Sequence, residues 1–186
     1  MDILDAEELF HVSLSAMRQG RDGEALEALK RLLAVEPDHA DARHLLAALY
    51  AQLGMMARAE ACWSALLDLA PSHEAARFQF GKLLTLKGDA DAVQQVLQPL
   101  ITRTDDIGCY AQAMVAGSTG DDLQMERLLA EGLSRAQSNP ALAGDMSQWL
   151  EHLRRSRDGG PVAAPAPSLP EVAEPVSVRL SRYGQH

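Results

Sequence analysis

Residues 40–73 read ADARHLLAALYAQLGMMARAEACWSALLDLAPSH, and their apolar residues follow the spacing of two short helices. Leu46 and Tyr50 fall on one face of the first helical segment, and Ala59 and Trp63 fall on one face of the second. Two such segments joined by a short turn predict an antiparallel helical hairpin.

The same arrangement recurs along the chain with a fixed period. Gly20, Gly54 and Gly88 each follow the previous one by 34 residues, and Pro37 and Pro71 differ by the same step. A fixed period in this range indicates stacked repeats with one helical hairpin per period. Glycine readily adopts the left-handed conformation that ends a helix, so we expect each glycine to end the first helix of its hairpin.

The pattern resembles the tetratricopeptide repeat, which has this period and combines a small residue, an aromatic residue, an alanine and a closing proline. The small residue is Ser13, Ala47 and Gly81 in the three successive units. The resemblance covers roughly residues 5–106 and weakens in the third unit, where Asp105 stands in place of the proline. It implies an all-α fold, a right-handed superhelical solenoid of antiparallel helix hairpins.

The repeats are followed by a divergent region and a tail. We predict tetratricopeptide-like repeats at about 6–39, 40–73 and 74–106, a divergent hairpin with a capping helix over 107–157, and a Pro-rich disordered tail over 158–186. The tail contains several prolines and too few large apolar residues to bury, which is typical of disordered segments.

Two polar residues predict helix starts in the divergent region. We interpret residues 107–118 and 121–137 as the helices of a fourth hairpin, with Asp121 as the N-cap of the second. Asn139-Pro140 has the form of an N-cap followed by proline at the first helical position. The helix that begins there is expected to run to about Arg157 and to cover the apolar surface of the last repeat.

The composition excludes several classes of partner. The chain has 186 residues, 47% of them hydrophobic, and a formal net charge of −9, so it lacks the basic surface that nucleic acid and anionic membranes require. No apolar stretch approaches the roughly 20 residues of a membrane span. The acidic start Met1–Asp5 is unlike a signal peptide, and we predict a cytoplasmic protein. Arginine outnumbers lysine and alanine is abundant, which favours a GC-rich bacterial source.

The sequence contains no recognisable catalytic constellation. It lacks a phosphate-binding glycine loop, a nucleophile motif and any His-x-x-x-His or Cys-x-x-Cys pair. His39 and His73 lie one period apart, which the repeat explains better than a metal site does. Cys62 and Cys109 fall in different hairpins and are interpreted as thiols of a reducing compartment. We therefore predict that the protein is not an enzyme and has no catalytic, cofactor or metal site.

The resemblance also implies a binding surface, because the first helices of such repeats line a concave groove. The groove residues in this chain are then Phe10, Leu14, Met17, His44, Ala48, Gln52, Phe78, Lys82 and Leu86. This wall is mostly apolar, and it fits a peptide-like segment of another protein with spaced hydrophobic anchors.

One subgroup of the family clamps the terminal carboxylate of chaperone peptides with lysine, arginine and asparagine side chains. The matching positions here are Phe10, Leu14, Leu45, Ala75 and Gln79. The clamp is therefore missing, and a co-chaperone of that type is excluded.

Three roles follow from these features. The first is a non-catalytic adaptor or scaffold that binds a peptide-like segment in the groove. The second is a bacterial secretion-type chaperone that holds an export client, and the third is an accessory subunit held by its convex face or tail. Val176–Tyr183 alternates apolar and polar residues like a strand, and we hypothesise that this part of the tail competes for the groove.

Overall fold

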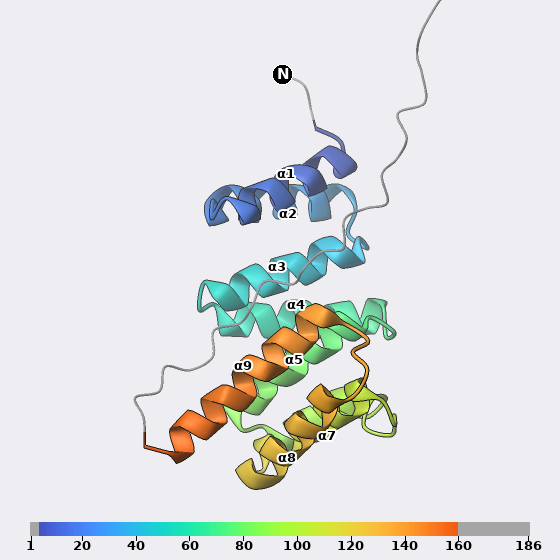
Figure 1. Cartoon of the computed structure of the whole chain (residues 1–186). Helices are drawn as coiled ribbons and strands as arrows, with labels where there is room; N and C mark the ends of the chain where they lie inside the picture. Colours follow the sequence, from blue (N-terminus) through green and yellow to red (C-terminus); the bar gives the residue numbers. More distant parts are fainter. Residues whose placement is uncertain (1–3, 160–186) are drawn as a thin grey trace, which may run out of the picture.

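The structure is a computed structural model that describes residues 4–159 as a stack of helices (Figure 1). Within these residues there are nine helices and no strand. The helices are α1 (Ala6–Arg18), α2 (Asp22–Val35), α3 (Ala40–Gln52), α4 (Met56–Leu69), α5 (Glu74–Lys87), α6 (Ala90–Leu97), α7 (Asp106–Ser118), α8 (Asp122–Ser134) and α9 (Pro140–Arg157). The predicted all-α helical solenoid is confirmed for this part of the chain. None of these helices is both long and apolar enough to cross a bilayer.

Consecutive helices pair into four hairpins, and the hairpins stack on one another. α1 packs on α2, α3 on α4, α5 on α6 and α7 on α8, while α2–α3, α4–α5 and α6–α7 join neighbouring hairpins. We call the surface formed by the first helices α1, α3, α5 and α7 the first-helix face. The Pro-rich tail from residue 160 onward, including Val176–Tyr183, lies outside the described residues.

The glycines of the repeat make the turn inside each hairpin. Gly20, Gly54 and Gly88 have φ angles of 66°, 74° and 72°, and Gly120 of the fourth hairpin has a φ of 78°. Residues with a Cβ rarely adopt this left-handed conformation, whereas glycine adopts it at little cost. The predicted role of the three periodic glycines is confirmed, and Gly120 extends it to the divergent hairpin.

Two histidines cap first helices. Nδ1 of His39 accepts a hydrogen bond from the main-chain N–H of Ala42 at 3.2 Å, and Nδ1 of His73 accepts one from Ala76 at 3.1 Å. Each bond satisfies one of the amide groups that the first turn of a helix leaves without a partner. The step of 34 residues between these histidines therefore reflects a repeated N-cap.

One arginine in each of these two helices, α3 and α5, forms a hydrogen bond with the turn that precedes the helix. The guanidinium groups of Arg43 and Arg77 donate to the main-chain carbonyls of Pro37 and Pro71, each six residues earlier. Arg77 also donates to the carbonyl of Val96 in α6 at 2.6 Å. The angle between one repeat and the next is thus held by hydrogen bonds as well as by apolar packing.

A polar anchor turns the chain back after α8. The main-chain N–H and the hydroxyl of Ser138 both donate to the carboxylate of Asp106, at 2.8 and 2.6 Å. The hydroxyl of Tyr110 donates to Oε1 of Gln137 at 2.6 Å. Asp106 and Tyr110 belong to α7, so these bonds fix the α8–α9 connection beside the start of that helix.

The last helix covers more of the stack than a terminal cap would. Asn139 caps α9 by accepting hydrogen bonds from two amides of its first turn, with Pro140 as the first residue. Near the other end, Arg154 and Arg157 pair with Glu126 of α8 at 2.9 and 2.5 Å. The helix thus packs on α8 as expected, and it also lies across α5 on the first-helix face (Figure 1).

The close contact of α7 and α8 predicts that Gly132 does not tolerate a side chain. A Cβ added there would lie 2.5 and 2.8 Å from two ring carbons of the fully buried Tyr110. Gly132→Ala should lower the free energy of unfolding by roughly 1–3 kcal/mol, the usual effect of overpacking.

Gly144 of α9 is the matched control, because a Cβ there meets no atom within 4 Å. Since alanine favours helix more than glycine does, Gly144→Ala should raise the free energy of unfolding by up to about 1 kcal/mol. Urea unfolding measures both variants. The same change in both would show that Gly132 is not a site of close helix packing.

Candidate partner-binding site

The predicted groove residues lie on α1, α3 and α5, where they differ in exposure. Gln52 and Leu86 are exposed and Phe10 is half-buried. The others are buried, namely Leu14, Met17, His44, Ala48, Phe78 and Lys82. Their contact with a partner stays a prediction, and three of them are accessible for it.

An ion pair between α5 and α9 explains why Lys82 is buried. Its Nζ lies 3.5 Å from Oδ2 of Asp145, and the two side chains are only 5% and 10% exposed. Nε2 of Gln79 donates to the same oxygen at 3.5 Å. The sequence predicts Lys82 in an open groove, whereas α9 covers it in the structure. Lys82 and Asp145 are 63 positions apart, and no sequence signal connects them.

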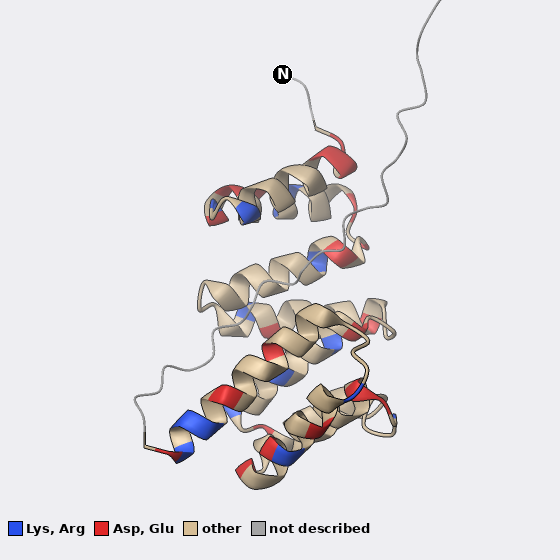
Figure 2. Cartoon of the chain, viewed as in Figure 1, with Lys and Arg blue, Asp and Glu red and all other residues tan. Residues whose placement is uncertain are grey.

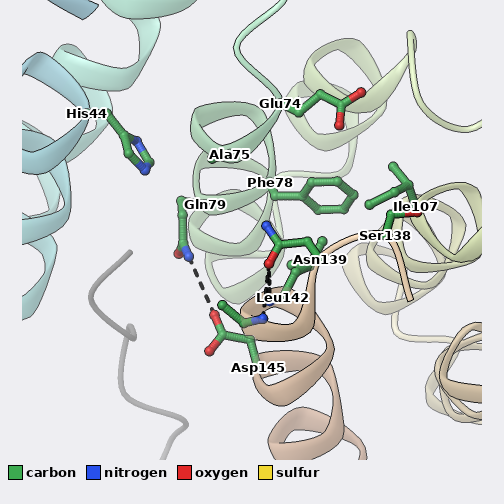
Figure 3. A pocket seen from close by; sticks show the side chains of 11 residues that line it. His44, Glu74, Ala75, Phe78, Gln79, Ile107, Ser138, Asn139, Leu142 and Asp145 are labelled. Carbon is green, nitrogen blue, oxygen red and sulfur yellow. Dashed lines mark hydrogen bonds between the residues drawn. The ribbon is translucent and has the colours of Figure 1, made fainter. Parts of the chain in front are cut away.

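A cavity of about 220 Å³ remains where α9 meets the first-helix face (Figure 3). One wall comes from His44 of α3 and Phe78 and Gln79 of α5, and Ile107 of α7 closes another side. The residues just before α9 and the first turns of α9 form the remaining side. The other lining residues are Glu74 and Ala75 of α5, Ser138 and Asn139 before α9, and Ala141, Leu142 and Asp145 of α9. Of the residues predicted for the groove, His44 and Phe78 line this cavity, and the contribution of α9 was not predicted.

His44 brings an unsatisfied donor to this cavity. Its Nδ1 accepts a hydrogen bond from the indole N–H of Trp63 at 3.2 Å. An indole N–H can only donate, so this nitrogen carries no proton and the proton of the neutral ring resides on Nε2. Nε2 is buried and has no hydrogen-bond partner within the described part of the chain. A buried donor without an acceptor costs about 1–3 kcal/mol.

The surroundings keep the His44 ring neutral. Burial and the nearby His73 lower the pKa of His44 to about 4, and Asp41 opposes this shift only in part. The rings of His44 and His73 are 5.0 Å apart, and Nε2 of His73 lies 3.6 Å from Oδ1 of Asp41. At neutral pH, His44 therefore contributes an uncharged N–H donor.

A second cavity, also of about 220 Å³, lies between α3, α4 and the end of α5. Its lining is mainly apolar and includes Met56, Trp63 and Leu86. Gln79 lines both cavities, so the two spaces lie on either side of one α5 side chain.

Two observations on residues 4–159 concern metal binding and thiol chemistry. Residues 4–159 contain no group of three or more His, Cys, Asp or Glu side chains that could hold a metal ion. Cys62 and Cys109 are free thiols, and burial raises the pKa of both, which makes them less reactive.

The lowered pKa of His44 predicts that the protein loses stability as the pH falls from 6.5 to 4. In this window the unfolded chain binds a proton at His44 and the folded chain does not, because the folded pKa is about 4 and the ordinary value is 6.5. The loss attributable to His44 should reach about 3 kcal/mol below pH 4. His44→Asn removes the titration and keeps an acceptor for Trp63, so its stability should fall less. Urea unfolding at several pH values tests this, and equal pH profiles would show that His44 is not responsible.

The buried ion pair predicts a difference between single and double variants. Lys82→Ala removes the buried cation that pairs with the carboxylate of Asp145 and should lower the free energy of unfolding by about 3 kcal/mol. Replacing both residues, by Lys82→Met and Asp145→Leu, should leave stability close to that of the natural chain, because apolar side chains of similar size fill the space. Thermal unfolding measures both, and equal losses would contradict this role of the pair.

Comparisons with known proteins agree with this architecture. The sequence model of the tetratricopeptide repeat family matches residues 16–67. Two solved structures are similar in fold, each with a TM-score of 0.60 and 18% sequence identity. They are MamA 41-end from Desulfovibrio magneticus RS-1, with 82% of this chain and 97% of that chain covered, and the MamA RS-1 ArsTM double mutant, with 83% and 97% covered. No curated protein is significantly similar in sequence.

The two kinds of similarity support different statements. At 18% identity, the likeness to the MamA structures concerns the fold alone. The family match concerns the sequence itself and spans parts of the first two repeats. Residues 16–67 of this chain are therefore tetratricopeptide repeat sequence, set within a longer helical solenoid.

Proposed function

We propose that the protein is a non-catalytic scaffold that holds a peptide-like segment of another protein on its first-helix face. The observation that carries this proposal is the cavity between α3, α5, α7 and α9, which combines apolar side chains such as Phe78, Ile107 and Leu142 with polar ones and with the unpaired Nε2–H of His44. Tetratricopeptide repeats support the same class of function, because stacked repeats present extended concave surfaces for binding.

α9 changes how such a site is built. It covers Lys82, and together with its N-cap Asn139 it supplies Leu142 as lining of the remaining space. The partner segment would then run from the α1–α3 part of the first-helix face, past Gln52, toward this cavity. A helix of the protein itself forms one wall of the binding site.

The charges on this face favour an uncharged segment over an acidic one. Lys82 is paired with Asp145, and the positions that match the carboxylate clamp carry no cation. Acidic side chains occupy the first turn of α1 and basic ones the last turn of α9, and further charged residues are spread over the other helices (Figure 2). At the cavity itself, a partner meets no Lys or Arg side chain.

The alternative roles differ in where the partner touches the protein. A chaperone for an export client would use the same face, and the partner's identity and solubility would distinguish it from a scaffold. An accessory subunit would be held by the second helices or by the tail. A contact map therefore separates the first two roles from the third.

Site-specific photo-crosslinking provides this map. A photoreactive phenylalanine analogue replaces Gln52, which is exposed on α3, or Gln95, which is exposed on α6 and serves as the matched control. We expect light-dependent crosslinks to a distinct protein in the native host from position 52 and none from position 95. Mass spectrometry of the crosslink should locate an apolar segment of that protein.

A different crosslinking pattern would indicate that the partner binds another surface of the protein. Crosslinks at position 95 alone would contradict binding on the first-helix face and favour an accessory subunit. Circular dichroism of both variants verifies that each remains helical.

A further inference from the structure

We propose that the cavity between α3, α5, α7 and α9 takes one uncharged unit of a peptide, an apolar side chain together with its main-chain carbonyl, and that Nε2–H of His44 donates to this carbonyl. The inference rests on the proposed function and deepens it, because it names the chemistry of the bound segment.

The unsatisfied N–H donor of His44 is the feature that points most directly to a ligand. His44 is 5% exposed, and its Nδ1 accepts a hydrogen bond from the indole N–H of Trp63, so the neutral ring carries its proton on Nε2. Figure 3 shows this ring extending from α3 toward Gln79 at the side of the cavity. A carbonyl oxygen placed there would accept the hydrogen bond that the described residues do not satisfy.

The size of the cavity fits a single residue. Its volume of about 220 Å³ is below the roughly 300–1,000 Å³ of pockets that enclose drug-sized ligands. The side chains of Phe78, Ile107 and Leu142 line it and favour an apolar occupant. One apolar side chain with its main-chain carbonyl can be accommodated in this space, and the exposed Ala75 and Asn139 leave one side open for the rest of the peptide.

The charges around the cavity disfavour an ionised occupant. No Lys or Arg lines it, so an anion would lack a counter-charge and would meet the carboxylates of Glu74 and Asp145. Both carboxylates are already paired, Asp145 with Lys82 and Glu74 with Arg103. A cation would face the N–H of His44 without gaining a free carboxylate. The uncharged peptide unit is the class that meets none of these penalties.

Capped amino acids are suitable probes, because they contain one side chain and its flanking amides. We would titrate the full chain with the N-acetyl, N′-methylamide derivatives of leucine, phenylalanine, glutamate and lysine, and follow the imidazole nitrogens of His44 by long-range proton–nitrogen NMR. The leucine or phenylalanine probe should shift the Nε2 signal saturably with a millimolar Kd, and the charged probes should bind at least about fivefold more weakly.

Two variants of His44 separate the donor from its structural role. His44→Asn keeps a side-chain oxygen that can accept from Trp63 and lacks the Nε2–H donor, so the affinity for the apolar probe should fall about fivefold or more. His44→Gln extends an amide N–H to the place of Nε2 and should keep most of the affinity. The indole N–H signal of Trp63 reports whether the surroundings remain intact. If either variant fails to fold, the Nε2 shift in the natural chain still decides the question.

Several outcomes would overturn the inference. No saturable shift with any probe would mean that the space holds only water, and equal binding of charged and apolar probes would refute the proposed ligand class. Unchanged affinity in His44→Asn would remove His44 from the site. Any of these results combined with crosslinking at position 52 would leave the scaffold function in place, whereas probe binding without crosslinking there would contradict the proposed function instead.

Discussion

The close approach of the two helices in each hairpin is the contact on which the rest of the structure depends. Ser13 and Ala47 are fully buried at this contact, and a Cβ on Gly81 would lie 2.8 Å from Leu97. The fourth hairpin achieves the same closeness with Gly132 against the ring of Tyr110. Because an isolated hairpin cannot bury its apolar faces, tightly packed hairpins stack, and the stack in turn creates the first-helix face.

The binding site depends on a second, less regular set of contacts. Ser138 and Gln137 hold the α8–α9 connection on α7, and this directs α9 back across α5. The Lys82–Asp145 pair then secures α9 on the first-helix face. A surface that would be an open groove in a simple repeat array thereby becomes a pocket lined by residues of α3, α5, α7 and α9. Nε2 of His44 is buried, and a hydrogen bond to it is stronger where the surroundings are less polar than water.

Much of the fold can be predicted from the sequence, and less of the site. The glycines of the repeat, the N-caps Asp121 and Asn139 and the span of α9 all follow from local patterns. His44 and Phe78, which line the cavity, are predicted as groove residues because the repeat places them on a first helix. The sequence does not show that α9 buries Lys82, since the contact joins residues 63 positions apart.

Local residue patterns were sufficient for the helices, their turns and their stacking, because the period, the left-handed glycines and the capping side chains each act within a few residues of where they stand. They were not sufficient for the chemistry of the site. The state of His44 depends on Trp63, 19 positions away, and on the burial that the packed helices impose. Whether a polar group is satisfied or left without a partner is a property of its surroundings in space, and those surroundings exist only once the hairpins have stacked and α9 has returned.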